Sequence, residues 1–336
     1  MKSRGMDVVR KNTQQLIITD TNHGNAEVKL SVTTTNIQNY FNTSKHTITI
    51  LPGFVAKSET GDITTLGRGG SDYTASIVAA ALNTEILEIW TDVSGMYTAN
   101  PKIVKQAKPI DYMSYREAME LSHFGAKVLY PPTVQPVLDA NIPVLIKNTM
   151  QPEDAGTKIS NETDISIKTP VKGITNISNI ALLTLQGSGM VGVPGFSKRL
   201  FETLAQEKIN VIFITQASSE HAICFGIDEK DTDKAQRAIN TTFEYEITLK
   251  KIEPIVVENQ LSIIALIGDN MKNHQGISGR MFSTLGKNNI NVRAIAQGAS
   301  ERNISAVINE TDVKKALNCL HESFFEIETK QLNLFV

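Results

Sequence analysis

The chain has 336 residues, 41% of them apolar, which suggests two or three globular domains with sizeable cores. Its net charge is −2, with Lys+Arg 33 against Asp+Glu 35, so no basic surplus points to nucleic acid or to an acidic membrane surface. No apolar run is long enough to span a membrane, and the N-terminus lacks a signal pattern. The two cysteines, Cys224 and Cys319, show no metal-ligand spacing with any histidine. We therefore expect a cytoplasmic protein without a bound structural metal.

The first half of the chain alternates strand-like and helix-like segments. This alternation favours an α/β domain with a mostly parallel sheet, in which ligands bind at the carboxyl ends of the strands. The segments are, in order, residues 46–56, 71–83, 85–95, 115–129 and 142–149. From about residue 150 to residue 171 the sequence becomes polar and loses its periodicity. We expect a linker there, or a loop-rich exit from the first domain.

Residues 64–82, TTLGRGGSDYTASIVAAAL, place a glycine-rich loop before a helix-like run. The glycines let the backbone turn sharply, and Ser71 or Asp72 can cap the helix. A helix N-terminus attracts an anion, Arg68 adds a fork of donors for a carboxylate or phosphate, and Asp72 can meet an ammonium group. This combination suits a zwitterionic amino acid beside a phosphate donor. The alternative is a tight strand-to-helix turn with a solvated arginine and a capping aspartate.

The second half of the chain contains an internal duplication. Residues 185–227 align without a gap over residues 266–308 at an offset of 81, as Gln297 minus Gln216 and Glu301 minus Glu220 both show. That period is too long for a solenoid repeat, so two copies of one small α+β domain are expected. Each copy has the pattern strand, glycine-containing loop, amphipathic helix, strand, turn, strand and second helix.

Gly187, Gly189 and Gly192 form a G-x-G-x-x-G pattern after a strand-like run. No acidic residue follows at the end of the next strand to bind a ribose, and the second copy keeps only the first glycine. We therefore interpret this stretch as a loop rather than as a dinucleotide site. The chain also has no P-loop motif.

Three motifs occur in order, TLGRGGSDYTA, WTDVSGMYTANP and SHFGAKVLYP, and the duplication follows them. Together they resemble aspartate kinases of the amino acid kinase family, whose regulatory part consists of paired ACT domains. The resemblance implies a three-layer α/β/α kinase domain and two ferredoxin-like ACT domains. It also implies transfer of the γ-phosphoryl group of ATP, carried as its Mg²⁺ complex, to the side-chain carboxylate of L-aspartate.

By position in the family motifs, the resemblance implies roles for two sets of residues. Those that bind the substrate would be Arg68, Gly69, Gly70, Ser71 and Asp72. Those that bind ATP would be Thr91, Asp92, Tyr97, Lys102 and Lys127. Without the resemblance, the same residues have structural interpretations: TDVSG can be a turn, Tyr97 a core or surface aromatic side chain, and the lysines solvated side chains.

The duplicated region resembles most the bifunctional aspartokinase–homoserine dehydrogenases that threonine inhibits. An amide side chain both donates and accepts hydrogen bonds, so Gln216 and Gln297 could each bind an amino acid effector. The resemblance implies that this effector is L-threonine rather than L-lysine. Gly192, Gly195 and Asn210 would line the neighbouring loop and strand start. ACT units of this family commonly pair, so a homodimer is expected.

The chain also departs from the family pattern. Tyr130 stands where the family usually has histidine, and the family's N-terminal Lys-Phe-Gly-Gly-Thr-Ser stretch does not occur. We therefore expect a fragment that is inactive alone: residues 1–165 from the kinase domain, 172–250 and 251–330 as ACT domains, and 331–336 as the start of a dehydrogenase domain. The alternative function is a catalytically incompetent, amino-acid-binding regulatory module.

Overall fold

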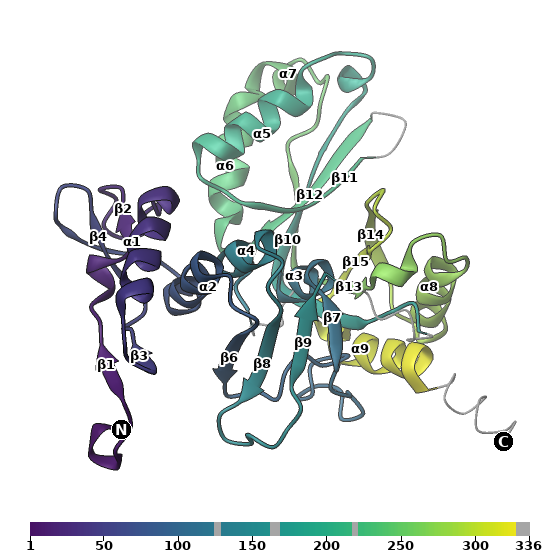
Figure 1. Ribbon diagram of the computed structural model, residues 1–336. Helices are drawn as coiled ribbons and strands as arrows, with labels where there is room; N and C mark the ends of the chain where they lie inside the picture. The colour runs from purple at the N-terminus through teal and green to yellow at the C-terminus, as the bar shows by residue number, and fades with distance from the viewer. Residues whose placement is uncertain (124–128, 162–168, 217–220, 327–336) are drawn as a thin grey trace, which may run out of the picture. The chain divides into compact units, whose positions relative to one another are not determined.

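The computed structural model describes residues 1–123, 129–161, 169–216 and 221–326 (Figure 1). Contacts divide the chain into two compact units. The first unit comprises residues 1–97 and 109–168, and the second comprises residues 98–108 and 169–336. Residues 331–336, in which the start of a dehydrogenase domain is expected, lie outside the described part.

The first unit is mixed α/β. Its strands are β1 (Val8–Arg10), β2 (Ile18–Thr19), β3 (Ile48–Ile50), β4 (Val55–Ser58), β5 (Ile63–Thr65), β6 (Leu87–Thr91), β7 (Tyr112–Ser114), β8 (Val144–Asn148) and β9 (Thr157–Ser160). Its α-helices are α1 (Leu30–Thr43), α2 (Gly70–Leu82), α3 (Tyr115–His123) and α4 (Pro131–Asp139). Among the described strands the sheet orders are β1-β3, β2-β4-β5 and β6-β8-β9-β7, and the pairs β1–β3, β2–β4, β6–β8 and β7–β9 are parallel. The expected α/β domain with mostly parallel pairing is confirmed.

The strand β9 corrects part of the expectation of a linker or loop over residues 150–171, of which residues 162–168 lie outside the described part. Ile159 pairs with Val144 of β8 and is fully buried, so this segment belongs to the sheet. The Thr157 hydroxyl accepts a hydrogen bond from the Met96 amide at 2.7 Å and donates one to the Ile110 carbonyl at 2.6 Å. A buried threonine with both bonds satisfied stabilises a strand whose composition is polar.

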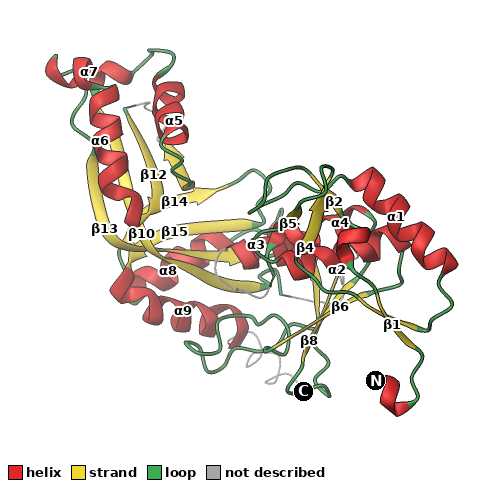
Figure 2. Ribbon diagram, turned by 90° about the vertical axis from the view of Figure 1, so that its left-hand side faces the viewer, coloured by secondary structure: helices red, strands yellow, loops and turns green. Residues whose placement is uncertain are grey.

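The second unit is one antiparallel sheet with helices packed against it (Figure 2). Its strands are β10 (Gly173–Gln186), β11 (Val211–Gln216), β12 (Ala222–Asp228), β13 (Val256–Ile267), β14 (Val292–Gln297) and β15 (Asn303–Asn309), in the order β11-β12-β10-β13-β15-β14. Its α-helices are α5 (Phe196–Gln206), α6 (Thr232–Thr242), α7 (Glu244–Thr248), α8 (Ile277–Lys287) and α9 (Val313–His321). A π-helical turn, Glu322–Glu326, follows α9.

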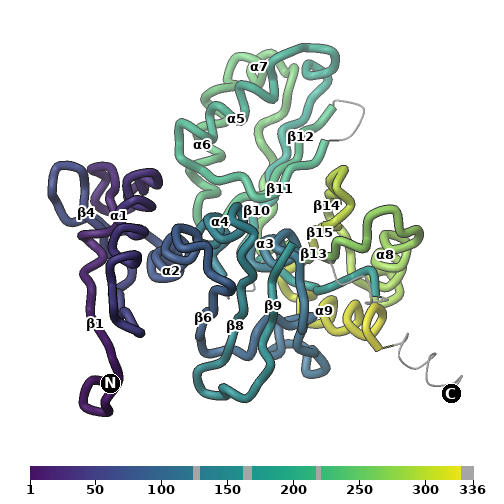
Figure 3. The backbone as a smooth tube through the Cα atoms, viewed as in Figure 1, coloured from purple at the N-terminus to yellow at the C-terminus, as the bar shows by residue number. Residues whose placement is uncertain are grey.

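The two copies predicted from the sequence are present, and Figure 3 traces the first in green and the second toward yellow. Helix α5 begins at Phe196 and α8 at Ile277, and this difference of 81 residues also separates β11 from β14 and β12 from β15. Each copy has its own apolar core, with Leu200 in the first and Met281 in the second, both 0% exposed.

The long strands β10 and β13 each serve both copies. The first part of β10 pairs with β13 from Gly173 to Ile177, and its later part pairs with both β12 and the start of β13. The register shifts where Asn179 has a positive φ of 58°, and Gln260 has a φ of 59° at the equivalent position of β13. The sheet therefore runs across the domain boundary predicted at 250/251, and the boundaries themselves stay a prediction.

Candidate functional site

The glycine-rich loop forms a tight turn between β5 and α2. Gly69 has a φ of +69°, and a Cβ atom there would lie 2.8 Å from Thr133 Cγ2. At Gly70 a Cβ atom would lie 2.7 Å from Phe54 Cδ2. Any other residue at these two positions would clash, so the geometry of the turn requires glycine.

The expectation that Ser71 or Asp72 caps α2 is wrong. The helix begins at Gly70, its N-cap residue is Gly69, and no side chain caps it. Ser71 and Asp72 instead lie in the first turn, because the positive φ at Gly69 starts the helix earlier than the sequence pattern indicates. The first N–H groups of a 13-residue helix are thus left without a side-chain cap, which favours an anion there.

Arg68 and Asp72 give this turn one charge of each sign. Arg68 is exposed, and its guanidinium carbon lies 5.1 Å from the centre of the Tyr130 ring, so the tyrosine that departs from the family pattern stacks beside the arginine. Asp72 is half-buried, and burial raises the pKa of its carboxyl group. A cationic ligand group would offset that cost of burying the carboxylate.

A second set of predicted residues lies at the carboxyl end of β6. Thr91 ends the strand opposite Asn148 of the parallel strand β8, and the Thr91 hydroxyl donates to Asp92 Oδ1 at 3.2 Å. Asp92 is exposed, and Tyr97 is half-buried and forms a bridge with Pro109. This is the edge at which parallel sheets bind ligands.

The structure brings the predicted residues together in groups rather than in one cluster. Arg68 to Asp72 share the α2 turn, while Thr91, Asp92 and Tyr97 share the end of β6. Within the described residues, no hydrogen bond or ion pair joins the two groups. Lys102 is exposed on a loop of the second unit, and Lys127 lies outside the described residues.

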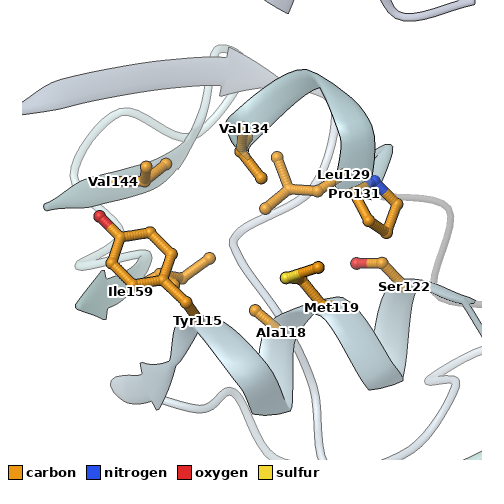
Figure 4. A pocket seen from close by; sticks show the side chains of 9 residues that line it. All are labelled: Tyr115, Ala118, Met119, Ser122, Leu129, Pro131, Val134, Val144 and Ile159. Atoms are coloured by element: carbon orange, nitrogen blue, oxygen red, sulfur yellow. The ribbon is translucent and has the colours of Figure 1, made fainter. Parts of the chain in front are cut away.

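An apolar crevice lies between α3 and α4, lined by Tyr115, Ala118, Met119, Ser122, Leu129, Pro131, Val134, Val144 and Ile159 (Figure 4). Its volume is ≈ 10 Å³, too small for a nucleotide or an amino acid. The Tyr115 hydroxyl donates to the Ile142 carbonyl, and burial raises the pKa of Tyr115 to about 12. The crevice is therefore part of the packing of this unit and not a binding site.

In the first ACT copy an open pocket of ≈ 410 Å³ contains three of the predicted effector residues. Its lining consists of Met190, Gly192, Val193, Pro194, Gly195, Phe196, Ser197, Gln216 and Ile223. Gly195 caps α5 with a φ of 102°, and Gln216 ends β11. Asn210 is exposed just before β11 and is not among the lining residues.

Sequence reasoning missed Ser197 as a lining residue, although its counterpart offered a signal. Ser278 occupies the equivalent position of the second copy, where its hydroxyl donates to Gln297 Oε1 at 3.3 Å. A serine repeated at the start of both helices, opposite a repeated glutamine, indicates a shared polar pair.

The first two glycines of the G-x-G-x-x-G pattern are closely packed, whereas Gly192 lines the open pocket. A Cβ atom at Gly187 would lie 2.4 Å from Ile252 Cα, and one at Gly189 would lie 2.6 Å from Lys251 Cβ. Only a short 3₁₀ turn follows, and α5 begins later, at Phe196. A dinucleotide site needs a helix that starts at the glycine loop, so its rejection agrees with the fold.

The part of the chain that the structure describes contains neither a cluster of metal-ligating side chains nor a membrane-spanning helix. No group of three or more His, Cys, Asp or Glu side chains there could hold a metal ion. No helix there is both long and apolar enough to cross a membrane.

Comparison with known proteins matches both parts of the chain. The model of the amino acid kinase family matches residues 1–148, and the model of an ACT domain matches residues 183–243 and 264–324. The bifunctional aspartokinase/homoserine dehydrogenase of Haemophilus influenzae is 43% identical over 88% of this chain and 36% of its own length. A chloroplastic counterpart from Arabidopsis thaliana is 39% identical over 92% of this chain and 34% of its own length. The chain thus spans about a third of these curated relatives.

Solved structures agree with this assignment. Aspartate kinase from Clostridium acetobutylicum superposes with a TM-score of 0.83 at 28% identity, covering 94% of this chain and 70% of that one. E. coli aspartokinase III in complex with aspartate and ADP superposes with a TM-score of 0.77 at 30% identity, covering 97% of this chain and 71% of that one. The chain therefore belongs to the amino acid kinase family, among the aspartate kinases that carry paired ACT domains.

Proposed function

We propose that the first unit binds L-aspartate and ATP for phosphoryl transfer, the reaction of an aspartate kinase. A β-carboxylate oxygen of aspartate would form a bond to the γ-phosphorus while the bond from that phosphorus to the β–γ bridging oxygen breaks, giving aspartyl phosphate and ADP. ATP enters as its Mg²⁺ complex. In such a transfer the protein positions the reacting oxygens and offsets their charge.

The α2 turn carries this proposal. It presents uncapped helix N–H groups, the exposed donor fork of Arg68 and the half-buried Asp72 within five consecutive residues. A carboxylate suits the first two, and the substrate ammonium group suits Asp72. The similar E. coli aspartokinase III binds aspartate and ADP. Thr91, Asp92, Tyr97, Lys102 and Lys127 would contact the nucleotide.

We assign the amino acid effector to the pocket of the first ACT copy. The N-terminus of α5 at Gly195 suits the effector carboxylate, and the Gln216 amide can donate to it and accept from it. None of the described lining residues is acidic, so a lysine side-chain ammonium would find no carboxylate among them. This supports L-threonine as the effector. The similar E. coli aspartokinase III also has a structure with lysine.

A competing function is that this chain acts only as a regulatory, amino-acid-binding module. Trapping aspartyl phosphate with hydroxylamine separates the two functions. We expect no useful turnover from the chain alone, and turnover once an N-terminal kinase segment from a relative is joined to it. Clear turnover by the chain alone would overturn the expected inactivity. A homodimer and a cytoplasmic location remain predictions.

Arg68→Ala tests the substrate site directly. Because the substitution removes the donor fork, it should weaken L-aspartate binding by about tenfold or more, in the range of a lost hydrogen bond to a charged group. Calorimetric titration with L-aspartate, in the presence of ADP and Mg²⁺, measures this. Arg116→Ala is the matched control, since Arg116 is an exposed arginine on α3 of the same unit. Equal affinities of the two variants would contradict the assigned role of Arg68.

A further inference from the structure

Residues 98–108 form a loop that belongs to the second unit, although both of its ends continue into the first. A short antiparallel ladder closes its neck. The Ile110 amide donates to the Met96 carbonyl at 2.8 Å, Tyr97 bridges Pro109, and the Thr98 amide donates to the Lys108 carbonyl at 2.9 Å. The loop therefore leaves and rejoins the first unit at one point, directly after Tyr97.

The loop is built into the core of the second ACT copy. Ala99 is 3% exposed and Val104 is 1% exposed, and both pack in the cluster that contains Ile174 and Leu317. The Ile174 amide of β10 donates to the Thr98 carbonyl at 2.8 Å. Burial of these side chains together with a backbone bond to a central strand holds the loop in one position.

His321, at the end of α9, binds the loop through its side chain. Its Nε2 lies 3.0 Å from the Thr98 hydroxyl, and His321 is 0% exposed. That hydroxyl also accepts a hydrogen bond from the Lys108 amide at 2.9 Å, and it can donate its own proton to Nε2. Nδ1 then carries the ring proton and donates to Glu326 Oε1 at 3.2 Å. A neutral imidazole in this tautomer satisfies both contacts.

Other groups around the ring favour this neutral form. Burial lowers the pKa of His321, Glu326 acts in the opposite direction, and the Lys108 ammonium lowers the pKa further. The Phe325 ring lies 4.9 Å from the imidazole, centre to centre. The ring is enclosed by the loop, by its own helix and by the π-helical turn.

We propose that this loop couples the second ACT copy to nucleotide binding, with His321 as the positioning residue. The inference rests on the proposed function, because Tyr97 and Lys102 are the residues assigned to the nucleotide there. Tyr97 directly precedes the anchored Thr98, and Lys102 is exposed on a turn whose ends are buried. A change in the ACT core therefore shifts both residues, and by thermodynamic linkage nucleotide binding acts back on the ACT core.

Among the described residues, the first copy has no counterpart of this anchor. The equivalent residue of the first copy is Asn240, since 321 minus 81 is 240. The Asn240 side-chain oxygen accepts from the Ile255 amide at 3.1 Å, within the ACT region. Asn240 therefore provides a control at the same place in the fold.

The test compares His321→Phe, which removes both ring hydrogen bonds, with His321→Gln, which keeps an acceptor near the Nε2 position. Amide hydrogen exchange in residues 97–110 and the Kd for ADP with Mg²⁺ are measured on the full chain. We expect His321→Phe to speed exchange in the loop and to raise the Kd by about tenfold, the effect of losing a buried hydrogen bond. His321→Gln should restore most of both, and Asn240→Ala should change neither.

If His321→Phe does not fold, Thr98→Val supplies the same test, because it removes only the hydroxyl and keeps the shape. Faster exchange in the loop with an unchanged Kd would overturn the coupling while leaving the proposed function intact. Failure of the unaltered chain to bind ADP would overturn the proposed function, and the role of the loop with it.

Discussion

The two ACT copies share their backbone but differ in some of their polar side chains. In the first copy, Gly192 and Gly195 border an open pocket at the start of α5. In the second, Asp269 forms an ion pair with Arg302 at 2.6 Å, and Glu301 accepts from the Asn273 amide at 2.7 Å, where Asn273 is the counterpart of Gly192. The second copy thus uses its own side chains where the first leaves room for a ligand.

This difference shows that the two copies kept a common core while their polar side chains diverged, and under our two proposals it also separates their roles. The first copy has the pocket that suits an amino acid, and the second has His321, which holds the loop after Tyr97. If both proposals hold, one fold supports binding in one copy and transmission in the other, as expected when function depends on a few side chains.

The largest expected effect tests the shared core. Leu204 and Leu285 occupy equivalent positions and are 1% and 0% exposed. Replacing either with alanine should lower the free energy of unfolding by about 3 kcal/mol, because each leaves a cavity in a closed core. Urea unfolding followed by far-UV circular dichroism measures this.

Because β10 and β13 serve both copies, the two leucine variants should shift one common transition. Two separate transitions, each sensitive to only one leucine, would show that the copies fold independently. That outcome would contradict the view that the two copies form one cooperative unit.

Lowering the pH should have a smaller effect on stability. It should destabilise the second copy at a higher pH than the first. The pKa of His321 lies below its ordinary value of 6.5, so the unfolded chain binds more protons, and the neutral ring's contribution to stability is lost as pH falls below about 6.5. In the first copy, the hydrogen bond from Arg199 lowers the pKa of Glu246 below 4.5, so the stability it provides is lost only as pH falls below that value.

Hydrogen exchange at pH 7.5 and 5.5, corrected for the intrinsic exchange rate, distinguishes the copies. Protection should fall in residues 98–108 and around α9 but not around α5. His321→Gln should remove this dependence. An equal loss in both copies would argue against a special role for His321.

Much of the second unit could be predicted because one sequence signal, the fixed offset, recurs in most of its helices and strands. In the first unit α1 was missed, since its sequence LSVTTTNIQNYFNT is rich in β-branched and polar residues. It is helical because Thr33 and Ile37 are fully buried on one face. Tertiary packing overrides propensity there, and a single sequence does not contain that packing.

The candidate site divides in the same way. The glycine turn was predictable because a sharp turn before a helix requires glycine. The N-cap of that helix was predicted at Ser71 or Asp72, whereas it is Gly69. The anchored loop was not predictable, because Thr98, which lies in the second motif, and His321, which lies in none, are 223 residues apart. A sequence shows local geometry, whereas contacts at such distances depend on the assembled sheet.

The smallest expected effect gives the most direct test of the division between the copies. Calorimetry would measure L-threonine and L-lysine binding to the chain and to its Gln216→Ala and Gln297→Ala variants. We predict saturable heat with threonine only, weakened about fivefold by Gln216→Ala, the effect of one lost hydrogen bond, and unchanged by Gln297→Ala, whose glutamine already accepts from Ser278. Binding lost only in Gln297→Ala, or binding of lysine instead, would contradict the account.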